Sequence, residues 1–554
     1  MKSLVQLALA PLVALALFLA PLGQALAQAP KPVALVSIAS IKENLADVGY
    51  ITRLTGMTDQ ADTAMFFVRA MLSGIDKERP LGVYFVSKPD GFHGIAFIPF
   101  EPNGLATFLK VQKETLGEPK DVGNGILEVG NGKTAFLKEQ GGWVFAAESK
   151  EFLTGLPDNP VGMLGTLPKD YNVAAKLMVQ NIPDELRRMT IDEIKVGVER
   201  FLDSPAARQG NVDREQARQL TKASLANLEK FFSEADELLF GLGIDEPAKH
   251  AVIDIGYSGK EGTSLARTIS SQADLKTNFA GFTLPEASVT LNLASKVSQE
   301  DMEQVGPALA QLRGQLSKQI DDSPDIPPDK RDALKSLLAQ LMDAVEKSIK
   351  TGRIDGGGTL VLMPKSVSFA FGGAVADGAD IEKILKSLVD LGKGSPNFPK
   401  VQLNAGSIGD LKLNRFTAPI PDDKGDVRDL LGDNLEIIVA IGPKSTIVAG
   451  GKNAEPLLRK VLDGSVQSRD KGIAPLKLDF SLLPILKFSQ SIDDNPIINN
   501  LIKVLEPTGN DHLSVVNQVN TRNNTVRIEI QEGIIKAIGE GAKAAGARAN
   551  RGGQ

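Results

Sequence analysis

The sequence predicts an α+β fold built from two related halves, each a largely antiparallel sheet with helices packed on one face plus longer helices. Three observations support this prediction. Short apolar runs separated by tight-turn residues indicate antiparallel hairpins. Stretches with helical periodicity lie between these runs. The same order of strand and helix patterns then occurs twice along the 554 residues.

The chain begins with the three parts of a secretory signal peptide. Lys2 supplies a positive charge, residues 4–19 are almost wholly apolar, and small residues follow at Ala25 and Ala27. Cleavage after Ala27 would make Gln28 the first residue, so we assign residues 1–27 to the signal peptide. We therefore expect export to the periplasm or the extracellular space.

An uncleaved membrane anchor is the alternative reading of the same segment, because its apolar run approaches the length that spans a bilayer. Pro11 and Pro21 disfavour a stable helix there, and the small-residue site favours cleavage. No later segment is apolar for long enough to span a membrane, so we expect no transmembrane segment in the mature chain.

Bulk composition excludes several classes of function. The chain has no cysteine, which removes thiol nucleophiles, thiolate zinc sites and iron–sulfur clusters. Its formal net charge is −6, whereas nucleic-acid binding requires a concentrated basic surface. We therefore expect no nucleic-acid partner.

The internal duplication is clearest when residues 81–109 are written beside 357–385, a constant shift of 276. Both stretches show an apolar run, a turn with lysine and proline, a second apolar run, a glycine-containing break and a helix pattern. The apolar helix positions coincide as Leu105, Phe108 and Leu109 with Ile381, Ile384 and Leu385. Such i, i+3, i+4 positions form one face of a helix.

The pattern extends outwards and defines the expected domains. The first half is 33–275, the second half is 282–540, and residues 541–554 read as a disordered tail because they are small and polar. The second half carries an insertion, which we place at 419–434. Residues 211–240 show a broad apolar stripe that predicts a helix, with Asp213 near its start. The Pro- and Asp-rich stretch 320–330 predicts a helix–helix linker.

The string GNGKT, residues 130–134, invites comparison with a phosphate-binding loop. That loop requires a glycine five positions before Gly132, where this chain has Leu127, and a helix directly afterwards. The residues that follow look like strands instead. Asn-Gly pairs at 124–125 and 131–132 favour tight turns, so we predict paired strands at 126–130, 134–138 and 143–147.

Candidate catalytic and metal-binding residues are sparse. The three histidines, His93, His250 and His512, are far apart and lack a zinc-binding spacing. We expect His93 to lie on a solvent face or in a local hydrogen bond, and the other two to border strands. The acidic clusters 321–325 and 422–426 lack calcium-loop spacing and read as solvated loops. We therefore name no catalytic, cofactor-binding or metal-binding residue, and no cofactor.

The signal peptide, the repeated strand–turn–strand–helix units and the string LLFGLGID at 238–245, read as a helix end before a strand, carry a resemblance. In these features the chain resembles exported, internally duplicated proteins of unknown function from planctomycete-type bacteria. The resemblance covers most of the mature chain as a pattern. It implies no activity, so no functional residue is carried over.

Three functional hypotheses follow. The leading one is an exported, non-enzymatic binding or structural-interaction protein, such as a component of the cell envelope. It follows from the absence of catalytic motifs and from the duplicated scaffold, since two similar halves can create a groove between them. The first alternative is a carrier of an apolar or lipid-like ligand, lined by strands rich in Leu, Ile, Val and Phe. The second alternative is a hydrolase with dispersed carboxylate or histidine catalytic residues.

Overall fold

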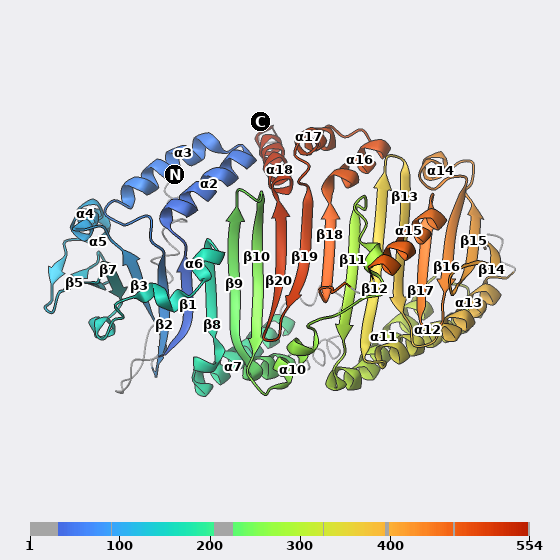
Figure 1. Cartoon of the computed structure of the whole chain (residues 1–554), viewed down its shortest axis with the longest axis horizontal. Helices are drawn as coiled ribbons and strands as arrows, with labels where there is room; N and C mark the ends of the chain where they lie inside the picture. The colour runs from blue at the N-terminus through green and yellow to red at the C-terminus, as the bar shows by residue number, and fades with distance from the viewer. Residues whose placement is uncertain are drawn as a thin grey trace. The chain divides into compact units, whose positions relative to one another are not determined.

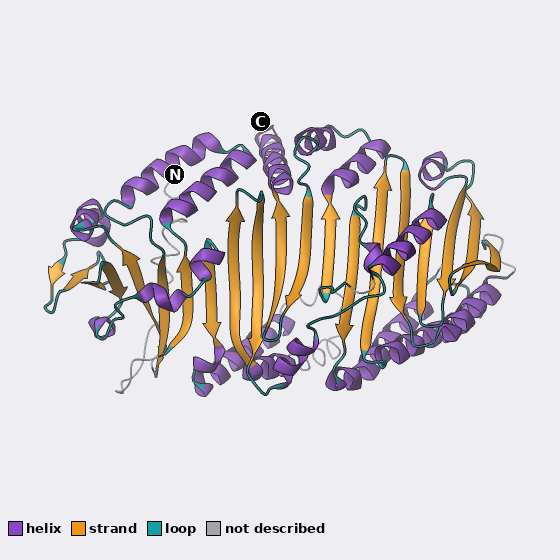
Figure 2. Cartoon of the chain, in the orientation of Figure 1, coloured by secondary structure: helices purple, strands orange, loops and turns teal. Residues whose placement is uncertain are grey.

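The computed structural model describes residues 31–89, 91–203, 225–324, 326–393, 398–468 and 471–551. The chain divides into two compact units: unit 1 is Met1–Ile269 with Arg522–Thr525, and unit 2 is Ser270–Thr521 with Val526–Gln554. Figure 1 labels the helices and strands of both units. Both units combine antiparallel strands with helices (Figure 2), which confirms the α+β class. The expected cleavage residues Ala25, Ala27 and Gln28 lie outside the described residues.

The sheet of unit 1 has the strand order β4–β5–β6–β7–β3–β2–β1–β8–β9–β10, and all these neighbours are antiparallel. Its described strands are β1 (Pro32–Ile38), β2 (Leu81–Lys88), β3 (Gly91–Pro99), β4 (Lys120–Asp121), β5 (Ile126–Val129), β6 (Ala135–Gln140), β7 (Trp143–Ala147), β8 (Val173–Met178), β9 (Ala235–Asp245) and β10 (His250–Gly259). Its helical segments include α2 (Ile41–Thr55), α3 (Thr58–Met71), α4 (Gly104–Val111), α5 (Lys113–Leu116), η1 (Lys150–Leu153), η2 (Pro160–Leu164), α6 (Leu167–Asp170), η3 (Val179–Asn181), α7 (Asp184–Asp203) and α10 (Ser264–Ser271).

The sheet of unit 2 has the order β14–β15–β16–β17–β13–β12–β11–β18–β19–β20. Its described strands are β11 (Val289–Lys296), β12 (Arg353–Met363), β13 (Ser366–Ala374), β14 (Lys400–Ile408), β15 (Leu411–Pro419), β16 (Asn434–Ile441), β17 (Ser445–Gly451), β18 (Leu476–Ser481), β19 (His512–Val519) and β20 (Asn523–Gln531), whose first three residues belong to unit 1. Its helical segments include η4 (Ala280–Phe282), α11 (Gln299–Asp322), α12 (Pro328–Ile349), α13 (Gly378–Gly392), α14 (Gly425–Leu431), α15 (Ala454–Gln467), α16 (Leu482–Ile492), α17 (Pro496–Leu505) and α18 (Glu532–Arg551).

Helical segments cover both faces of the unit 1 sheet. Adjacent residues of a strand point to opposite faces. Phe145 of β7 belongs to a core that also contains Leu153 of η1 and Leu164 of η2. Its neighbour Val144 belongs to a separate core, which contains Leu105 of α4. The prediction of helices on one face is therefore wrong, because the strands beneath are apolar on both sides and both sides need cover.

Unit 2 shows the same arrangement. Leu458 of α15 and Phe282 of η4 pack on one face of the sheet, against residues such as Ile438 and Ala440 of β16. Leu385 of α13 packs on the other face, in a core with partly buried Ile437 and Val439. Helices α16, α17 and α18 form a further small core around Leu486, Ile502, Leu505 and Ala537.

The GNGKT segment joins two strands, as predicted, and opens no helix. Strands β5, β6 and β7 form an antiparallel meander. Gly141 and Gly142, with φ of 63° and 76°, make the two-residue turn into β7, a conformation that glycine adopts without steric cost. The connection between β5 and β6 is longer than the predicted two-residue turn, because Val129 pairs with Ala135 and residues 130–134 lie between them.

Two further sequence predictions need correction, and another is confirmed. The helix over 211–240 is wrong at its end: residues 225–234 are helical, but β9 begins at Ala235, because β8 and β10 pair with it on both sides. Residues 211–224 lie outside the described part. The tail 541–554 is helical as far as Arg551, in keeping with the high helix propensity of its alanines. The linker within 320–330 is confirmed, since α11 ends at Asp322 and α12 begins at Pro328.

Phe97 supports a first testable prediction, because its side chain is fully buried and its ring lies 5.8 Å from that of Trp143, the chain's one tryptophan. We expect Phe97→Ala to lower the free energy of unfolding of unit 1 by about 3–5 kcal/mol, since it leaves a cavity. Urea unfolding followed by Trp143 fluorescence measures the loss. The control is Phe66→Ala on α3, where the side chain is 70% exposed; an equal loss there would contradict the assignment of the core.

Candidate functional site

A continuous apolar surface crosses five strands of unit 1. Directly opposed residues in an antiparallel ladder lie on the same face, so the register defines three rows across β2, β1, β8, β9 and β10. We call this set the unit 1 lattice. Its rows are Val83, Val36, Ala175, Phe240 and Ile255; Phe85, Ala34, Leu177, Leu238 and Tyr257; and Leu81, Ile38, Val173, Leu242 and Ile253.

The unit 1 lattice is buried at one end and open at the other. Leu81 of β2 belongs to the core that α2 and α4 cover. On β9 and β10, by contrast, the paired residues Phe240 and Ile255 are 47% and 51% exposed. Tyr257 is half-buried beside Phe231, whose ring lies 5.4 Å away. The apolar face therefore extends beyond the helices that cover its beginning.

Unit 2 carries a similar surface across β13, β12, β11, β18 and β19, which we call the unit 2 lattice. Phe371, on β13, is 51% exposed. Asn517 on β19, at the end of the third row below, is the polar side chain of this set. The rows are Phe371, Gly358, Leu291, Leu478 and Val515; Phe369, Leu360, Val289, Phe480 and Leu513; and Gly373, Gly356, Leu293, Leu476 and Asn517.

Glycines make parts of this surface flat. A Cβ atom placed on Gly358 would lie 2.7 Å from the ring of Phe371, so that ring lies over the neighbouring strand. Phe369 lies over Gly450 of β17 in the same way, with the corresponding distance 2.5 Å. Covering a strand glycine with an aromatic ring protects the exposed backbone. The result is a flat apolar surface at these positions.

The size of each lattice can be estimated from strand geometry. Five strands spaced by about 4.8 Å and three rows spaced by about 6.8 Å span roughly 24 Å by 20 Å, or about 500 Å². Monomers seldom expose apolar patches beyond about 300–600 Å², and larger patches usually mark interaction sites. Each lattice, counted with its buried edge beneath the helices, is as large as the largest apolar patch of a typical monomer, and such patches are often functional.

The opposite face of β18 and β19 is polar and carries His512. The Nδ1 atom of His512 lies 2.6 Å from Oδ1 of Asp479, and its Nε2 atom lies 3.9 Å from Oδ1 of Asp511. The hydrogen bond to Asp479 raises the pKa of His512 above 6.5. Burial lowers this pKa, but the negative charges of Asp479 and Asp511 raise it further, and the positive charge of Lys477 lowers it slightly. Charged His512 is thus favoured in the folded chain.

Asp511 uses its carboxylate to hold the start of α16. It accepts hydrogen bonds from the Ser481 hydroxyl at 2.8 Å and from the Leu483 backbone N–H at 2.6 Å. A carboxylate at this position satisfies a helix N–H that lacks an intrahelical partner. Because Ser481 donates to Asp511, no Ser–His–Asp relay is assembled around His512. The cluster reads as a strand–helix junction.

The other histidines lie at separate places. His93 is 4% exposed, its Nδ1 contacts the Glu148 carboxylate, and its ring stacks on Phe152 at 4.6 Å. The expected local hydrogen bond is thus present, and the solvent-face alternative is wrong. His250 begins β10 and His512 begins β19, so both border strands as predicted. Among the described residues, no three His, Asp or Glu side chains gather as metal ligands would.

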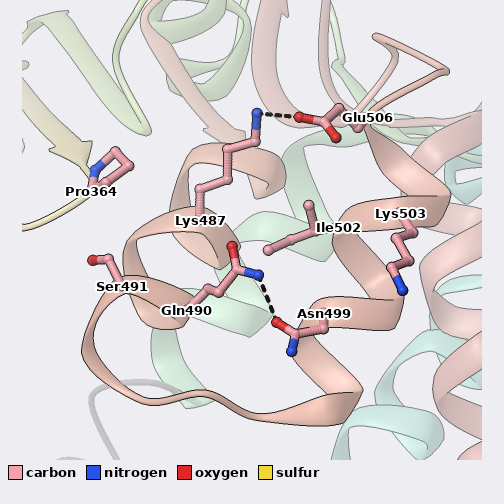
Figure 3. Close-up of a pocket in the computed structure, with 8 residues that line it drawn as sticks. All are labelled: Pro364, Lys487, Gln490, Ser491, Asn499, Ile502, Lys503 and Glu506. Atoms are coloured by element: carbon pink, nitrogen blue, oxygen red, sulfur yellow. Dashed lines mark hydrogen bonds and ion pairs between the residues drawn. The ribbon is translucent and has the colours of Figure 1, made fainter.

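A groove of about 650 Å³ lies in unit 2 between Pro364, α16 and α17 (Figure 3). Its polar groups are largely engaged with one another. Lys487 pairs with Glu506 at 2.6 Å, and Gln490 donates to Asn499 at 2.6 Å. A ligand would have to displace these bonds, so the groove is a weaker candidate than the lattices.

Comparison with known proteins gives no match to a family model, a curated protein or a solved structure. Within the described residues, no helix has the length and apolar character to cross a membrane.

The sequence suggested strands that line an apolar site but did not locate the apolar surface on β9, because LLFGLGID was read as the end of a helix. The available signal was the alternation of Leu238, Phe240, Leu242 and Ile244.

His512 supports a prediction about pH. A folded-state pKa above the unfolded value stabilises the fold fully below about pH 6.5, and this contribution is lost as the pH rises through the folded pKa. We expect His512→Gln to remove that dependence, so that the wild-type chain loses stability relative to the variant as the pH rises. Urea unfolding at pH 5.5–8.5, followed by circular dichroism, measures the difference. Parallel pH profiles for the two proteins would contradict the Asp479–His512 pair.

Proposed function

We propose that this chain is an exported, non-enzymatic binding protein and that the two lattices are its binding surfaces. The observation that carries the proposal is the half-open apolar face in both units, with Phe240, Ile255 and Phe371 about half exposed. Water contact with such a surface is unfavourable by roughly 25 cal/mol per Å² of apolar area. Covering it with an apolar partner would therefore release free energy.

Binding is favoured over hydrolysis by what surrounds the candidate catalytic groups. His512 and Asp479 contact each other, but Asp511 is committed to Ser481 and Leu483. His93 is buried against Glu148 and Phe152. A general base needs hydrogen-bond reach to a bound substrate, and neither histidine lines the groove at α16 and α17.

We further propose that the two units arose by duplication. The support is the correspondence of their strand orders, in which each strand of unit 2 occupies the place of the strand ten numbers lower in unit 1. The β2–β3 hairpin ends with Lys88 paired to Gly91, and the β12–β13 hairpin ends with Met363 paired to Ser366. Corresponding residues of the two units are therefore 275 positions apart here, one fewer than the 276 inferred from the sequence. In unit 2, the connection between β15 and β16 contains α14. In unit 1, the corresponding connection between β5 and β6 is only residues 130–134, so the extra residues of unit 2 are in line with the expected insertion.

Export is supported by the apolar leader and the small residues at Ala25 and Ala27. We expect full-length protein produced in a Gram-negative host to be recovered from the periplasm with Gln28 as its first residue. Intact-mass measurement of the purified protein tests the cleavage site. Replacing Ala25 and Ala27 by Leu should block cleavage. A mature protein that retains Met1 or residues 2–27 would contradict the assignment.

Surface binding is tested with the dye 8-anilinonaphthalene-1-sulfonate, which fluoresces on apolar protein surfaces. We expect the native chain to enhance the dye's fluorescence, and expect Phe240→Asn with Ile255→Asn, or Phe371→Asn, to reduce that enhancement by roughly half. Such exposed positions tolerate polar residues with little loss of stability.

The matched control for dye binding is Phe66→Asn, which removes an equally apolar and more exposed side chain from α3. It should leave the lattice-dependent fluorescence unchanged. A control that loses as much fluorescence as the lattice variants would contradict the proposed surfaces. Urea unfolding of every variant identifies any loss that comes from unfolding.

A further inference from the structure

We infer that each lattice binds the hydrocarbon chains of one lipid molecule, so that the protein has two such sites, one in each unit. The inference rests on the proposed binding function and adds the ligand class and the number of sites. It also makes the sites separable, because each set of rows is built from the strands of a single unit.

The chemistry of the lattice side chains selects hydrocarbon. In unit 1 only Tyr257 carries a polar group, and its hydroxyl already accepts a hydrogen bond from Asn524 at 2.9 Å. In unit 2 the polar exception is Asn517 at a corner. Protein–protein interfaces carry about one hydrogen bond per 100–200 Å². A surface of about 500 Å² whose interior offers no hydrogen-bonding side chain suits a ligand that needs none.

Charge is also lacking across the lattices. The charged residues that flank the rows on β8, β9 and β18 lie on the opposite faces. Lys176 and Glu237 alternate with lattice residues and pair with each other at 3.2 Å. Lys477 and Asp479 alternate with Leu476, Leu478 and Phe480 in the same way. A charged or strongly polar partner would lose hydration at the lattice without regaining hydrogen bonds.

The area of a lattice argues against a second copy of this chain as the occupant. Two copies packed face to face through one lattice would bury about 1,000 Å² in total, below the roughly 1,200–2,000 Å² typical of stable interfaces. Hydrocarbon chains fit better. The bilayer's hydrocarbon core is about 30 Å thick and two chains deep, so one chain is roughly 15 Å long. Three rows span about 20 Å along the open strands, so one chain can lie along them.

The aromatic rings that lie flat over strand glycines also support a hydrocarbon ligand. The ring of Phe371 lies over Gly358 beside Leu291, and that of Phe369 over Gly450. Hydrocarbon chains lying along such a surface contact it over their whole length. A ligand that inserts an anchoring side chain would need a pocket, and the groove at α16 and α17 is lined by other residues.

Phosphatidylglycerol with two palmitoyl chains is the probe for the test. Because this lipid forms bilayers in water far below the protein concentration, it is added to the delipidated mature chain in micelles of a nonionic detergent, and native mass spectrometry counts the bound molecules. We expect two bound molecules per chain. Phe240→Asn with Ile255→Asn should leave one, Phe371→Asn should leave one, and the combined variant should leave none, each affected site losing affinity at least tenfold.

Matched controls are Phe66→Asn for unit 1 and Val466→Asn for unit 2, which change exposed apolar residues on α3 and α15; both should still bind two. Equal stoichiometry in all variants would overturn the inference, as would a stable dimer that forms in place of lipid binding. If the dye binds through the lattices but the lipid does not, the ligand class is wrong while the proposed function stands. If neither binds, both fail.

Discussion

The register of the antiparallel ladders is the constraint on which the rest of the structure depends. Because side chains alternate with a period of two, a slip of one residue would exchange the two faces of a strand. In β18, for example, Leu478 would move to the side of the sheet where Asp479 lies. The Asp479–His512 contact, the support of α16 by Asp511 and the continuity of the unit 2 lattice all depend on one register. The unit 2 lattice and the junction at the start of α16 are thus on opposite sides of the same ladder.

Local sequence signals predicted the turns and the elements around them. Gly141 and Gly142 mark a tight turn because few other residues adopt their backbone angles at low cost. The strands of the β5–β7 meander and the break between α11 and α12 followed from similar signals. Residues 235–240 are ambiguous on their own, because their apolar spacing also fits a helix and the alternation becomes clear only through Leu242 and Ile244. Only pairing with β8, which is distant in sequence, and with the following strand β10 decides that Ala235 begins a strand.

The candidate site was harder to predict because it is a property of many strands together. Val36, Ala175 and Phe240 share a row only through two ladders that join distant segments. The sequence shows that these residues are apolar, but it does not show whether a helix covers them. Likewise, the histidines gave no indication that His512 would meet Asp479, which lies 33 residues earlier. Charge and composition constrained the classes of function, whereas topology placed the candidate site.

The distribution of helices gives the strongest physical reason to regard the lattices as functional. Where the chain covers this face, it does so with short amphipathic helices: α4 packs on the core around Val144, and α13 on that around Phe416. Covering apolar surface stabilises a fold and limits aggregation. On the same face, Phe240 of β9 and Ile255 of β10 are about half exposed, and so is Phe371 of β13. An apolar face left open in both units, beside helices able to cover it, is the arrangement expected when the cover is supplied by a ligand.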